Sequence, residues 1–89
     1  MGLEIARINK KFAIAKLKAI VEIEEALKQA RTDAERNEIL AILSRVKWMK
    51  LSSIPLLIAE LDQKYGNAQG IIADLVARIK EIIASELGV

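Results

Sequence analysis

The chain has 89 residues with a formal net charge of +2, and 53% of its residues are hydrophobic while only 3% are aromatic. This length predicts one small helical domain over residues 1–89, with no room for a separate catalytic domain. The absence of Cys and His removes thiolate nucleophiles, the commonest metal ligand and the usual general base near neutral pH, so we expect neither enzymatic activity nor a cofactor.

The first predicted element is a helix over residues 3–30, because no Gly or Pro interrupts this stretch. Its apolar residues cover far more than the stripe of a little over 100° that an ordinary surface helix carries. One stripe is expected to face the core. A second apolar side contains Ile14, Leu17 and Val21. The helix is therefore predicted to be central in the fold or shared with another chain.

The stretch RTDAE predicts the end of the first helix and the start of a second helix over residues 33–51. Thr32 is suited to be the N-cap, and Glu35, three residues later, completes a capping box. Four apolar residues then repeat at helical spacing and predict a core seam: Ile39, Ile42, Val46 and Met49. The helix also has apolar residues off that seam: Leu40, Leu43 and Leu51.

The stretch WMKLSSIPLL holds the only Trp and the only Pro, and it is either a binding site or a joint between helices. Ser52 or Ser53 is suited to be an N-cap, and Pro55 falls in the first turn of a third helix over residues 54–65. A bulky residue beside such a corner usually fills the gap that the corner opens. Trp48 is therefore predicted to be a buried plug, whose replacement by Ala costs a few kcal/mol.

Gly66 and Asn67 predict the end of the third helix and the cap of a fourth helix over residues 68–87. Together the elements predict an all-α fold, a compact bundle of four helices with short links. No uncharged run approaches the ~18–20 residues of a membrane span, and no apolar segment follows the basic start as in a signal peptide. We expect a soluble protein, cytoplasmic or from recombinant expression, without a membrane partner.

Opposite charges four residues apart predict ion pairs along exposed helix faces: Lys18–Glu22, Glu24–Lys28, Glu60–Lys64 and Asp74–Arg78. If the first two helices form an antiparallel hairpin, basic side chains gather toward one end of the molecule, beside Trp48. This basic end consists of Arg7, Lys10, Lys11, Lys18, Arg45, Lys47 and Lys50. As an alternative function, we expect a small helical subunit that contacts nucleic acid through this end.

The predicted helix ends carry residues that favour helix capping or termination: Thr32, Ser53 and Asn67 as caps, and Gly66 and Gly88 at helix ends. In these capping residues, and in its lack of Cys and His, the whole chain resembles computationally designed (de novo) helical bundles, although no diagnostic motif carries the resemblance. The unequal helices and the two apolar sides of the first helix depart from a regular bundle, and they suit either a natural protein or a less idealised design. The resemblance implies a scaffold whose purpose is the fold or the assembly itself.

The main prediction is a structural or self-assembling helical bundle without catalytic activity, whose partner is a second copy of itself. Its apolar content exceeds what a lone chain of this size needs, and association is the natural outlet. The candidate interface and core residues are Ile14, Leu17, Val21, Leu40, Leu43, Trp48, Met49 and Leu51.

Overall fold

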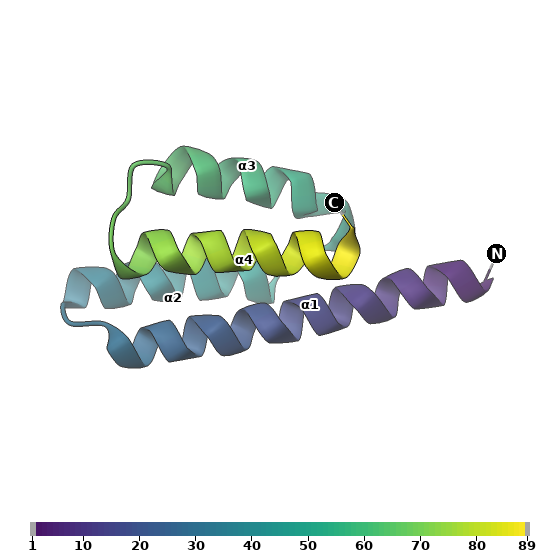
Figure 1. Ribbon diagram of the computed structural model, residues 1–89, viewed down its shortest axis with the longest axis horizontal. Helices are drawn as coiled ribbons and strands as arrows, with labels where there is room; N and C mark the ends of the chain where they lie inside the picture. The colour runs from purple at the N-terminus through teal and green to yellow at the C-terminus, as the bar shows by residue number, and fades with distance from the viewer. Residues whose placement is uncertain (1, 89) are drawn as a thin grey trace.

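The computed structural model describes residues 2–88 and, within them, the side chains from Arg7 onward. This part of the chain forms an all-α bundle of four α-helices, without a strand among the described residues (Figure 1). The elements are α1 (Gly2–Gln29), α2 (Asp33–Lys47), the 3₁₀ turn η1 (Leu51–Ser53), α3 (Ile54–Tyr65) and α4 (Ile71–Leu87). The predicted fold class is confirmed.

Consecutive helices run in opposite directions, so the chain passes back and forth along the direction of α1 (Figure 1). α1 packs chiefly against α4 and then against α2, while α3 packs against α4 and η1. The molecule measures 48 × 23 × 19 Å, and its long axis follows α1, because 28 helical residues extend about 42 Å. The N-terminal part of α1 projects beyond the ends of the other helices (Figure 1).

Each helix contributes one buried stripe to the core, and the stripe of α1 is rich in alanine. The small side chains let the neighbouring helices approach α1 closely. The buried residues of α1 are Ala15, Ala19, Ile23 and Ala26. The core seam predicted for the second helix is confirmed, because all four of its members are buried: Ile39, Ile42, Val46 and Met49. α3 and α4 add Ile54, Leu57, Leu61, Leu75, Val76, Ile79 and Ile83.

The connection between α1 and α2 is closed by the predicted N-cap. The backbone N–H of Glu35 donates a 3.1 Å hydrogen bond to Oγ1 of Thr32, which satisfies one of the free donors of the first turn. The carboxylate of Glu35 accepts a 3.0 Å hydrogen bond from the N–H of Arg31. In a capping box this carboxylate would accept its hydrogen bond from the backbone N–H of Thr32, the N-cap residue. Here the donor is the preceding residue, Arg31.

Two predicted helix boundaries are wrong. α2 ends at Lys47, four residues before the predicted position. Beyond it, the N–H of Met49 bonds to the carbonyl of Val46 (3.3 Å), three residues earlier, and this tighter turn replaces the α-helical spacing of four. α4 begins at Ile71, and Asn67 does not cap it. Gly70 precedes it with φ 71° and ψ −140°, a conformation that favours glycine and interrupts the helix there.

The two ends of α3 also differ from the expected capping. Ser53 precedes α3 without a side-chain capping hydrogen bond, while Pro55 lies in the first turn, as predicted. Gly66 ends α3 with helical angles of φ −60° and ψ −28°, so it is not a left-handed cap. Its lack of a side chain is still needed, because a Cβ there would lie 2.5 Å from the carbonyl oxygen of Asp62.

Candidate functional site

The side of α1 that faces away from the bundle carries a row of exposed apolar side chains. Ile14, Leu17 and Val21 are 39%, 67% and 53% exposed. Spacings of three and four residues place them on one helix face, opposite the alanine-rich buried stripe. We call these three residues the outer face of α1. Together they form a row of exposed apolar side chains and are not scattered singly over the surface.

The outer face is uncovered because the neighbouring helices occupy the two flanks of α1. On one flank, α4 is held by an ion pair from Arg78 to Glu22 (2.9 Å) and by a second ion pair that links Lys18 and Glu86. On the other flank, Nζ of Lys16 donates a 3.4 Å hydrogen bond to the carbonyl of Met49 at the end of α2. Neither neighbour extends around to the outer face.

Exposed charges of opposite sign lie at the two ends of the outer face. Toward the N-terminus are Lys10 and Lys11, which we call the basic pair, and toward the C-terminus are Glu24 and Glu25, the acidic pair. Of these four residues, only Glu25 forms an ion pair with a described side chain, because its carboxylate lies 3.6 Å from Nζ of Lys28. The outer face is therefore electrically polarised along α1, although Lys28 offsets part of the negative charge at its C-terminal end. Lys10, Lys11 and Glu24 form no ion pair with a described side chain.

The off-seam leucines of the second predicted helix have different environments. Leu40 is 42% exposed and Leu51 is 37% exposed, so both contribute to the surface. Leu43 is half-buried and packs against the core cluster. The three residues therefore do not form one continuous second side of α2.

The prediction that Trp48 is a buried plug is wrong. The side chain of Trp48 is 74% exposed, whereas that of Met49 is 6% exposed and occupies the corner. The helix has already ended at Trp48, whose φ of −104° and ψ of 8° turn the chain so that the next side chain enters the core. Nζ of Lys47 lies 5.8 Å from the centre of the Trp48 ring, within the range of a cation–π contact.

The exposed Trp48 lines an open hollow at the corner between α2 and α3. Leu56, which is 60% exposed, lines the same hollow. The sequence prediction did not include Leu56. A signal was present, because Leu56 is apolar but lies off the repeat of Ile54, Leu57 and Leu61 that α3 buries. The hollow has a volume of about 390 Å³ and is lined by Ser44, Arg45, Trp48, Met49, Lys50, Ser53, Leu56 and Leu57. We call it the corner hollow.

The predicted basic end is not one uniform patch. Lys18 and Arg45 already form ion pairs, with Glu86 and Glu60 respectively. The remaining members are exposed in two groups. Arg7 and the basic pair lie on the part of α1 near the N-terminus, while Lys47 and Lys50 lie beside Trp48.

The four ion pairs predicted within single helices are also wrong. The described charges pair chiefly between helices, for example Lys80 with Asp62 at 2.5 Å, because the antiparallel packing brings flanking residues of neighbouring helices together. These pairs are exposed, so each contributes about 0–1 kcal/mol to stability.

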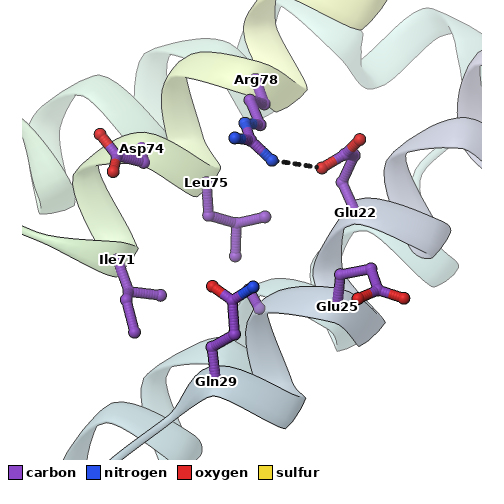
Figure 2. Close-up of a pocket in the computed structure, with 8 residues that line it drawn as sticks. Glu22, Glu25, Gln29, Ile71, Asp74, Leu75 and Arg78 are labelled. Carbon is purple, nitrogen blue, oxygen red and sulfur yellow. Dashed lines mark hydrogen bonds and ion pairs between the residues drawn. The ribbon is translucent and has the colours of Figure 1, made fainter.

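A second, smaller hollow of about 70 Å³ lies between α1 and α4 (Figure 2). Figure 2 shows Arg78 reaching toward Glu22, while Glu25 and Asp74 point away from this pair. The acidic groups are thus separated from one another. Among the residues that the structure describes, no three His, Cys, Asp or Glu side chains are grouped in a way that could hold a metal ion.

Within residues 2–88, no helix combines the length and the apolar character that crossing a membrane requires. The outer face of α1 and the corner hollow both place exposed large apolar side chains beside charged ones. Comparison of the sequence with protein-family models, with curated proteins and with solved structures gives no match.

Proposed function

We propose that the chain is a structural, self-assembling helical bundle without catalytic activity, and that its copies associate through the outer face of α1. The observation that carries this proposal is the exposure of Leu17, 67% of whose surface faces solvent in the middle of a row of apolar residues. Burying such a row stabilises an assembly by about 25 cal/mol per Å² of apolar surface. The same reading fits a designed scaffold whose purpose is its assembly.

The size of the outer face indicates how strong this association is. The outer face has only three apolar anchors, whereas a stable complex that buries roughly 1,200–2,000 Å² uses about 20–30 residues on each side. We therefore expect a dimer with a micromolar dissociation constant, whose population depends on protein concentration.

The test compares two leucines with similar exposure on different surfaces. Leu17→Glu places a charge in the outer face, and Leu56→Glu places the same charge in the corner hollow, where the leucine is 60% exposed. In sedimentation equilibrium, we expect Leu17→Glu to be monomeric and Leu56→Glu to associate like the unmodified chain. Equal association of both variants would exclude the outer face as the interface.

The corner hollow supports a second candidate function, contact with single-stranded nucleic acid. Trp48 offers an exposed ring for base stacking, and Lys47 and Lys50 place positive charge beside it, while the charge of Arg45 is compensated by Glu60. Because Trp48 is the only Trp, its fluorescence reports binding directly. Titration with an oligonucleotide is expected to quench this fluorescence, with an affinity that falls as salt rises. Unchanged fluorescence at low salt would rule this candidate out.

A further inference from the structure

We infer that the second copy docks antiparallel on the outer face of α1, about a two-fold axis that passes between Leu17 and Lys18. In this arrangement the basic pair of each copy faces the acidic pair of the other. The inference rests on the proposed function, because it requires that copies associate through the outer face. It adds the direction and the register of the partner.

The register follows from the symmetry of the row itself. The midpoint between Ile14 and Val21 lies between Leu17 and Lys18. An antiparallel partner centred on this point places Ile14 of one copy against Val21 of the other and the two Leu17 side chains close together at the axis. Self-complementary contacts of this kind are the property of a two-fold interface, the commonest form of protein dimer.

The charges agree with the same centre, although they are independent of the apolar residues. The basic pair and the acidic pair lie equally far from the midpoint, on opposite sides of it. An antiparallel partner therefore brings opposite charges together at both ends of the row. In a parallel dimer, Lys10 and Lys11 of one copy would face the same lysines of the other, and the glutamates would likewise face each other. Such like-charge contacts destabilise the dimer.

The positions of the charges around the helix fit as well. At 100° per residue, Glu25 and Lys11 lie on the flank of the outer face nearer α4, Glu24 lies on the opposite flank, and Lys10 lies near the middle. A two-fold axis perpendicular to the helices keeps matching flanks together. Glu25 therefore meets Lys11 of the other copy, and Glu24 meets Lys10.

Lys18 is the one charged residue that lies close enough to the two-fold axis to face Lys18 of the other copy. Its ammonium group is already paired with Glu86 of α4 in the same chain. The pairing draws the Lys18 side chain toward the flank of α1 and compensates its charge. It therefore leaves the centre of the interface to Leu17.

The first test reverses the charges in two separate chains. One chain carries Lys10→Glu with Lys11→Glu, and the other carries Glu24→Lys with Glu25→Lys. Each chain alone is expected to dimerise roughly tenfold or more weakly at low salt, because like charges now meet at both ends. An equimolar mixture is expected to form a heterodimer as strong as the unmodified dimer. Failure of the mixture to associate would overturn the inference.

The second test uses the absence of native Cys, so that every introduced thiol is unique. With copper–phenanthroline as oxidant, Leu17→Cys is expected to form a disulfide-linked dimer. Ile14→Cys alone is expected to remain unlinked, because the two thiols lie about 10 Å apart along the axis, beyond the ~7 Å that a disulfide spans. A mixture of Ile14→Cys and Val21→Cys is expected to link.

The outcomes separate this inference from the proposed function. A dimer in which every single-Cys variant links to itself would show a parallel pair, which contradicts the antiparallel register but leaves association through the outer face intact. An unmodified chain that stays monomeric at every concentration would contradict both. Circular dichroism of each variant shows whether the exposed substitutions leave the helices folded.

Discussion

The hydroxyl of Tyr65, the last residue of α3, donates a 2.8 Å hydrogen bond to Oε2 of Glu38 on α2. Nζ of Lys64 lies 4.0 Å from the same carboxylate and 5.4 Å from the centre of the Tyr65 ring. Burial of the phenol, together with the hydrogen bond and the negative charge of Glu38, raises the pKa of Tyr65 to about 12. The contact joins α2 and α3 at the end of the bundle opposite the corner hollow.

This contact predicts a loss of stability at high pH. The unfolded chain deprotonates Tyr65 near pH ~10, so between this pH and about 12 the folded chain holds more protons than the unfolded one. The stabilisation is therefore complete below pH ~10 and is lost as the pH rises through the folded-state pKa. The measurement is the free energy of unfolding of the unmodified chain minus that of Tyr65→Phe, at several values of pH.

Tyr65 is also the only Tyr, so the near-ultraviolet absorbance of tyrosinate reports its titration alone. We expect a midpoint near 12 in the folded chain and the ordinary value in denaturant. A folded-state midpoint equal to the denatured one would contradict the hydrogen bond to Glu38.

The corner between α2 and α3 predicts unequal losses of stability for substitutions at two neighbouring residues. Met49→Ala is expected to destabilise the fold by about 2–5 kcal/mol, because it empties a filled position in the core. Trp48→Ala removes a ring that is 74% exposed, so the expected loss is below about 1 kcal/mol. Urea unfolding of both variants checks this. A larger loss for Trp48→Ala than for Met49→Ala would place the ring in the core after all.

The N-cap of α2 predicts a measurable loss for Thr32→Ala. Removing Oγ1 leaves the N–H of Glu35 without its 3.1 Å acceptor, and such caps are worth about 1 kcal/mol. Thr32→Ser keeps the hydroxyl and is the matched control, with stability close to that of the unmodified chain. Equal losses for the two variants would mean that the methyl group, and not the hydrogen bond, is what matters.

The start of α4 predicts that Gly70→Ala is costly although the site is open. A Cβ at Gly70 or at Gly88 would meet nothing within 4 Å, so any loss comes from the backbone alone. With φ 71° and ψ −140°, Gly70 lies where L residues are strained by about 1–3 kcal/mol. Gly88, at φ 72° and ψ 30°, lies in the left-handed helical region, which costs an L residue about 1–2 kcal/mol, so its replacement by Ala is expected to lose less. Thermal unfolding compares the two.

The helices were predictable because their signals are local. An uninterrupted stretch without Gly or Pro specified α1, and the spacing from Ile39 to Met49 specified the buried seam of α2. The sequence also indicated the second apolar side of α1, because the apolar residues of this helix span a wider arc than one neighbouring helix can cover. It corresponds to the exposed outer face.

The errors concern choices that depend on tertiary contacts. Whether Trp48 or Met49 fills the corner depends on where α2 stops, and the backbone contact to Val46 decides this. The charges that follow helical spacing find partners on other helices, such as Arg78 with Glu22, because the packing of α4 on α1 brings them together. The start of α4 depends on a left-handed Gly70, which the sequence offers as one of several glycines.

We propose that the outer face of α1 joins two copies, a claim that the mass of the unmodified chain in solution tests. Light scattering behind a sizing column, over a series of loading concentrations, is expected to show twice the chain mass of 9.9 kDa at high concentration and a return toward the monomer on dilution. Because the row is apolar at its centre, raised salt is expected to weaken the dimer without abolishing it. A mass that stays at one chain at every concentration would contradict the claim.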